Sequence, residues 1–278
     1  MQAQAQLVPS EGTGAWWRIL LVGMLLFVLG ILVFALTGNP NLFPTVVLIG
    51  NFLVPISYVA FFYQRRHMSQ VTLPTTARSF LYGGVLGVFA AGVAEPVIIH
   101  RLTFLSAFEV GLIEELAKII GVLVVARHRA HDAELDGLIL GAAAGMGFAA
   151  LESTGYVFTA FLMSGGSLSS LVGVTLLRGL LAPVGHGTWT AILASVLFRE
   201  TRLKHFRLNR RVVGAYLTVV VLHGLWDGLS GLLTAFGASD SNILVGQVCV
   251  AVAGLFILWR RWREAVRPLR VPAGAALA

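Results

Sequence analysis

The stretch at 108–118 constrains this chain most, because it sets three carboxylates and one ammonium inside an apolar run. Its sequence is F-E-V-G-L-I-E-E-L-A-K, and the run around it covers 102–126. A membrane hydrocarbon core about 30 Å thick is crossed by a helix of about 20 apolar residues. A helix over 102–126 would therefore hold Glu114 and Glu115 near the middle of a membrane. A central ionised carboxylate costs roughly 2.5–3.5 kcal/mol to insert, and such groups usually face a bundle interior and mark a functional site.

The composition agrees with a membrane protein, since 57% of the 278 residues are hydrophobic and 12% are charged. We therefore expect an all-α, polytopic membrane helix bundle of about eight transmembrane helices. The predicted spans are 16–37, 43–63, 79–99, 102–126, 137–162, 170–198, 212–236 and 242–259. We expect one membrane domain over 1–262, with its motif-bearing core at about 102–236. The basic segment 263–278 is expected to be a disordered cytoplasmic tail.

The cations cluster between spans two and three, four and five, and six and seven, whereas the alternate connections are nearly neutral. By the positive-inside rule, this pattern predicts a multi-pass plasma-membrane protein with both termini in the cytoplasm. The same rule explains the net charge of +7, so we expect no nucleic-acid partner. The basic tail is expected to be attracted to anionic membrane lipid.

The fourth span carries Glu114, Glu115 and Lys118 within five residues. Either glutamate can pair with the lysine, because residues three and four apart lie on one helix face. The two glutamates themselves point about 100° apart. We therefore expect one carboxylate to pair with Lys118 and the two to divide the roles of reaction centre and support, although the spacing does not say which takes which.

The fifth span carries glycines at intervals of four, Gly137, Gly141 and Gly145. A stripe of small residues lets a neighbouring helix approach closely. Glu152 follows seven residues later, close to two helical turns, so it is expected to point into the same seam.

The sixth span holds Arg178 and His186 on either side of Pro183. Proline there, with a glycine on each side of the histidine, predicts a kink or a local opening of the helix. In the seventh span, the four-residue spacing of His223 and Asp227 places both on one face, where the carboxylate can orient the imidazole.

Several protease designs are absent from the sequence. There is no H-E-x-x-H zinc helix, no G-x-S-x-G nucleophile elbow and no pair of aspartates inside the spans. The remaining groups suit hydrolysis by a glutamate that acts as general base on water, with no cofactor. They also suit one divalent metal, most simply zinc, bound through Glu152, His186 and His223 with a fourth position for water.

Four ordered motifs resemble those of the PrsW family of intramembrane proteases, which is similar to the CAAX prenyl protease and bacteriocin-processing superfamily. The motifs are E-E-L-A-K at 114–118, G-M-G-F-A-A-L-E at 145–152, R-G-L-L-A-P-V-G-H at 178–186 and H-G-L-W-D at 223–227. The resemblance covers about 108–230. It departs at Ser153, where the family usually has asparagine.

This resemblance implies a protease that cleaves a membrane-associated protein, the best-known substrate being an anti-sigma factor. The catalytic candidates are Glu114, Glu115, Glu152, His186, His223 and Asp227, with Lys118 and Arg178 in support. Two other functions use the same residues. A proton- or ion-coupled carrier would use the interior charges as a relay, and a non-catalytic membrane binding or immunity protein would keep them as a buried polar network. We expect the protease.

Overall fold

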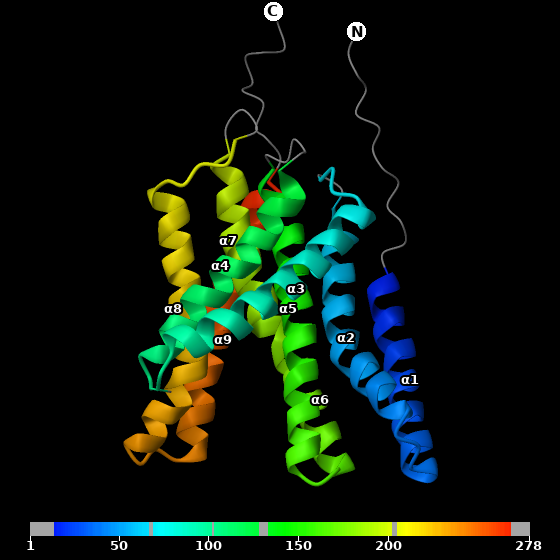
Figure 1. Ribbon diagram of the computed structural model, residues 1–278. Coiled ribbons are helices and arrows are strands. Elements are labelled where there is room, and N and C mark those ends of the chain that lie inside the picture. Colours follow the sequence, from blue (N-terminus) through cyan, green and yellow to red (C-terminus); the bar gives the residue numbers. More distant parts are fainter. Residues whose placement is uncertain (1–13, 67–68, 102, 128–132, 202–204, 268–278) are drawn as a thin grey trace, which may run out of the picture.

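The computed structural model describes residues 14–66, 69–101, 103–127, 133–201 and 205–267. Within these ranges every regular element is a helix, which confirms the predicted all-α bundle (Figure 1). The elements are α1 (Ala15–Thr37), α2 (Leu42–Tyr63), α3 (Leu73–Ile98), α4 (Ser106–Ala126), α5 (Glu134–Met163), α6 (Leu168–Leu181), the 3-10 turn η1 (Ala182–Val184), α7 (His186–Arg199), α8 (Arg210–Ala235) and α9 (Asp240–Ala265).

Seven segments in the described chain are long and apolar enough to cross a membrane, if Leu168–Arg199 is taken as one crossing. The helix outside this set is α4, whose 21 residues include the charges of the central motif. Together they agree with the eight predicted spans. Helix α9 continues to Ala265, three residues into the segment expected to be a tail. The rest of that segment from 268 onward, and Leu102 at the predicted start of the fourth span, lie outside the described residues.

Helix α5 forms the centre of the bundle and packs against α2, α3, α6 and α7. In its most apolar stretch 89% of the residues are buried, against 6% for α1 at the edge. Carbonyl oxygens of α7 lie 2.1–2.5 Å from where a Cβ would stand at Gly137, Gly141 and Gly145. The predicted seam is confirmed, and it brings the backbones of α5 and α7 into direct contact.

The sixth predicted span is broken, as its proline predicts. Helix α6 ends at Leu181, one 3-10 turn follows, and α7 begins at His186. The Thr188 hydroxyl donates a 2.7 Å hydrogen bond to the Pro183 carbonyl, and the Tyr58 hydroxyl lies 3.3 Å from the same hydroxyl. These bonds fix the break, which places His186 at a helix start instead of within a continuous helix.

The described chain begins and ends at the same end of the bundle, as an even number of crossings requires (Figure 1). Helices α2, α4 and α7 also finish at this end, and the clustered cations follow these helices in the sequence. The hairpins α5–α6 and α8–α9 turn at the opposite end. That the basic end faces the cytoplasm stays a prediction.

The contact between α3 and α5 provides a test of this packing. A Cβ at Gly147 would lie 1.9 Å from the Phe80 carbonyl oxygen. Because that atom is backbone, Gly147→Ala should destabilise the fold by about 1–3 kcal/mol, the usual cost of overpacking. Thermal unfolding in detergent measures the effect. The control is Gly155→Ala on the same helix, where a Cβ meets open space; equal melting of the two variants would contradict the packing.

Candidate active site

The site is built around the ammonium of Lys118, which is completely buried. Its Nζ donates 2.9 Å hydrogen bonds to Glu114 Oε2 and to Glu115 Oε1, and lies 2.9 Å from His186 Nδ1. It also lies 3.9 Å from the centre of the Phe148 ring. The expectation that a single glutamate pairs with Lys118 is wrong, because the long side chain lies between both carboxylates.

The two adjacent glutamates have different surroundings. Glu115 is fully buried: its Oε2 accepts a 3.0 Å bond from the Thr190 hydroxyl, and its Oε1 lies 3.2 Å from His223 Nδ1. Glu114 instead forms part of a cavity wall. Both carboxylates are buried, but the helix turns Glu115 into the packed interior and Glu114 toward the cavity.

His223 lies among three carboxylates. In addition to the Glu115 contact, its Nε2 is 3.1 Å from Asp227 Oδ2 and 3.6 Å from Glu114 Oε2. The predicted pairing of His223 with Asp227 is confirmed. The Trp189 ring packs on the imidazole with 4.7 Å between ring centres. The histidine is thus fixed from several sides, while the Asp227 side chain stays 42% exposed at the cavity.

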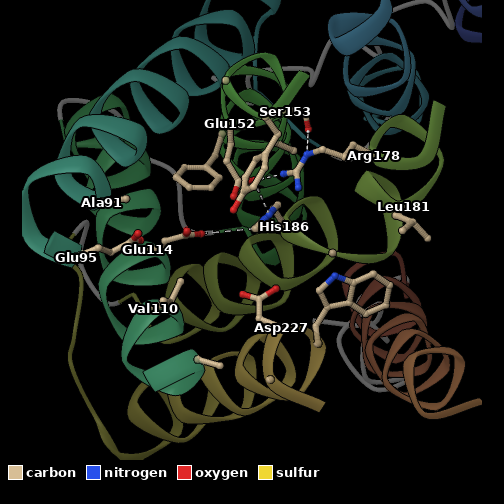
Figure 2. A pocket seen from close by; sticks show the side chains of 18 of the residues that line it. Ala91, Glu95, Val110, Glu114, Glu152, Ser153, Arg178, Leu181, His186 and Asp227 are labelled. Carbon is tan, nitrogen blue, oxygen red and sulfur yellow. Dashed lines mark hydrogen bonds and ion pairs between the residues drawn. The ribbon is translucent and has the colours of Figure 1, made fainter. Parts of the chain in front are cut away.

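Glu152 contacts both the Arg178 guanidinium and the His186 imidazole. Arg178 Nη2 donates a 2.6 Å bond to Glu152 Oε2, and His186 Nε2 lies 3.2 Å from the same oxygen. Arg178 Nε also donates to Ser153 Oγ at 2.9 Å. Figure 2 shows these side chains converging on one side of the cavity. This arrangement holds Arg178 and His186 in place across the seam between α5, α6 and α7.

All of these groups surround a cavity of about 1120 Å³, walled by α3, α4, α5, α6 and α8. Figure 2 shows Glu114, Glu152, Arg178, His186 and Asp227 around it. Its wall extends to Thr159, near the last turn of α5, and to Ala235, the last residue of α8, which precede the α5–α6 and α8–α9 hairpins. The structure therefore brings the eight predicted site residues into one cluster, with Glu115, Lys118 and His223 packed behind the wall.

Residues 72–259, well over half of the chain, match a known family described as PrsW family intramembrane metalloprotease. The chain belongs to the PrsW family. The resemblance read from the four motifs is confirmed, and the match extends from α3 into α9. No curated protein and no solved structure matches the chain. Membership of the PrsW family, together with the apolar helices, makes this a multi-pass membrane protein of the peptidase class.

The PrsW description includes a metal, and three donor groups of the site could form a metal shell. Glu114, His186 and His223 each offer one ligand atom, and these atoms lie within 4.8 Å of one another. Two imidazoles and one carboxylate are a common catalytic zinc set, so the residues fit. The carboxylate of this group is Glu114, and not the Glu152 predicted from the sequence. Glu152 is already hydrogen-bonded to Arg178. Lys118 contacts two of the three groups, so a metal would share them with the ammonium or replace it.

In PrsW proteins the residue after the second-motif glutamate is usually asparagine, and here it is Ser153. Its hydroxyl accepts a bond from Arg178 Nε. The substitution therefore leaves a group that holds the arginine in place, and it removes the amide that the family resemblance would have placed near a substrate.

The sequence motifs missed Glu95 on α3. Its carboxyl group lines the cavity and points toward Glu114 in Figure 2. Its buried Oε1 has no partner in the part of the chain that the structure describes. The sequence signal that could have identified Glu95 was its position inside the third predicted span, where an acidic residue is unusual. It belongs to none of the four motifs. Thr190 was missed too, because a threonine in an apolar helix has no distinctive pattern.

The placement of Glu95 beside Glu114 predicts a positioning role for Glu95. Glu95→Leu removes the polar group next to Glu114 and should slow substrate cleavage by about 10- to 100-fold, as is typical when a group supporting a site residue is lost. Glu95→Gln should recover much of the rate, because its amide can donate to Glu114. Cleavage of a reporter by purified protein measures both. Wild-type rates in Glu95→Leu would show that the contact is not used.

Proposed function

We propose that this chain hydrolyses a peptide bond of a membrane-associated protein in the cavity, with Glu114 as the group that activates water. The observation that carries this proposal is the different placement of the two adjacent glutamates. Glu114 faces the cavity, whereas Glu115 is enclosed by bonds from Lys118, Thr190 and His223. This supports a chemical role for Glu114 and a positioning role for Glu115.

In this mechanism Glu114 takes a proton from water, and the water oxygen adds to the carbonyl carbon of the substrate. Arg178 stabilises the resulting oxyanion. It is the one lysine or arginine among the described residues of the cavity wall, and only two of its five N–H groups are used by Glu152 and Ser153. The C–N bond then breaks, and the proton held by Glu114 passes to the departing amine.

The family description favours a metal-assisted form of the same reaction. When bound, a divalent metal such as zinc would lower the pKa of a water molecule at the site to about 7. Glu114, His186 and His223 would hold the metal. Asp227 pairs with His223 Nε2 at 3.1 Å and lines the cavity with a 42% exposed side chain, so its carboxylate would accept a proton from water there.

The substrate class follows from where the cavity lies. Its walls are transmembrane helices, so a peptide must come to it within or beside the bilayer, as a membrane-associated protein would. An anti-sigma factor is one such substrate. We place the protein in the plasma membrane with its basic end in the cytoplasm, which the clustered cations support.

Glutamine substitutions distinguish the chemical role proposed for Glu114 from the positioning role proposed for Glu115. Glu114→Gln should lower cleavage by about 10²- to 10⁴-fold, the usual contribution of a general base, while the protein still folds. Glu115→Gln should lower the melting temperature as well as cleavage, because a buried, fully bonded carboxylate is altered. Fragments of a membrane-anchored reporter in proteoliposomes, detected by mass spectrometry, measure the rate.

The matched control is Glu109→Gln, which changes an exposed carboxylate of the same helix and should alter neither quantity. Normal cleavage by Glu114→Gln would exclude Glu114 as the activating group. Ion flux without any peptide fragment would favour the carrier instead.

Metal content tests the metal-assisted form. Protein purified in detergent should contain about one zinc per chain, and His223→Ala should remove it. His205→Ala is the control, since His205 is exposed and far from the cluster in sequence. Active, folded protein without metal would contradict the metal-assisted form and leave Glu114 as the base.

A further inference from the structure

A second cavity, of about 1160 Å³, lies between α1, α2 and α3 and shares no residue with the catalytic cavity. We call it the α1–α3 crevice. It is lined by the first turns of α1, the later part of α2 and the first turns of α3. These segments lie at the basic end of the bundle, where α1 stands at the edge beside α2 (Figure 1).

The crevice has an apolar body and a polar mouth. Its body is lined by side chains such as Ile19, Ile56 and Phe80, and its mouth by Arg18 and Gln64. Arg18 is exposed, and its guanidinium lies 5.5 Å from the centre of the Trp17 ring. The Oε1 of Gln64 is buried without a partner in the described chain. The crevice therefore suits an occupant with a long apolar part and an anionic, hydrogen-bonding head.

The depth of the crevice matches one leaflet of a bilayer. Along α2 its lining runs from Phe52 to Gln64, about 18 Å at 1.5 Å per residue. Half of a hydrocarbon core is about 15 Å. A transmembrane helix of a substrate would instead span both leaflets and has a diameter of about 10 Å. An acyl chain fits this depth and a spanning helix does not.

We propose that the α1–α3 crevice binds one anionic phospholipid of the leaflet at the basic end. Its acyl chains lie between α1, α2 and α3, and its phosphate lies at Arg18. A headgroup hydroxyl, as in phosphatidylglycerol, donates to Gln64 Oε1. The lipid fills a space that otherwise leaves apolar side chains without contacts on one side.

The crevice lies between helices outside the range that matches the PrsW family and a helix inside it. Helices α1 and α2 precede the matched range that begins at residue 72, whereas α3 lies inside it. Helix α3 borders the crevice at its start and carries Glu95 into the catalytic cavity near its end. Bound lipid thus attaches the two N-terminal helices to the helix that supports the active site. The proposal itself does not depend on the proposed reaction.

The test measures lipid binding to the purified full-length protein by native mass spectrometry and by thermal unfolding in detergent. Phosphatidylglycerol should bind at one per chain and raise the melting temperature, and phosphatidylcholine should do so much less. Arg18→Gln should weaken phosphatidylglycerol binding by about fivefold, the effect of one cation near an anionic headgroup. Arg210→Gln, an exposed arginine at the same end on α8, should leave binding unchanged.

A second variant tests the site by filling the crevice instead of removing a charge. Ala77 lines the crevice and is exposed, so Ala77→Trp should fill it and abolish the saturable site without unfolding the protein. Equal binding of both lipids, equal effects of Arg18→Gln and Arg210→Gln, or the same stabilisation by inorganic phosphate would overturn the proposal. So would a change of oligomeric state in Ala77→Trp, which would identify a second copy of the chain as the occupant.

Discussion

The rest of this site depends on the hydrogen bonds and ion pairs that the buried Lys118 ammonium forms. An ammonium or carboxylate in the membrane interior costs several kcal/mol unless it is paired and hydrogen-bonded. Lys118 meets Glu114 and Glu115 from its own helix and His186 from α7, so each of these groups lowers the cost of burying the others. The result is a polar cluster that holds α4 against α7 inside an apolar bundle and fixes where every neighbouring side chain can lie.

Close backbone packing makes this cluster possible. The glycines of α5 let α7 approach until carbonyl oxygens occupy the space of the missing side chains. The break at Pro183 then starts α7 at His186, so that the imidazole enters the cluster from a helix start. Thr190, one turn further, reaches Glu115. Packing by small residues and a broken helix therefore bring the His186 imidazole and the Thr190 hydroxyl of α7 into the cluster on α4.

The two cavities divide the molecule along α3. One has carboxylates in its wall and extends toward the end where the hairpins turn; the other is apolar with a cationic mouth and lies at the basic end. Helix α3 borders both, and its glycines pack it tightly on α4 and α5. The same helix therefore lines the crevice near its start and carries Glu95 into the catalytic cavity near its end.

The sequence by itself determined the membrane bundle, the PrsW motifs, the glycine seam, the break at Pro183 and the His223–Asp227 pair. These features are local, because each depends on hydropathy or on spacing along one helix. Only the tertiary structure decided that Lys118 contacts both glutamates, that Glu114 and not Glu115 faces the cavity, and that Glu95 joins the site. Those outcomes depend on which face of each helix meets which neighbour, and helical spacing alone does not define that rotation.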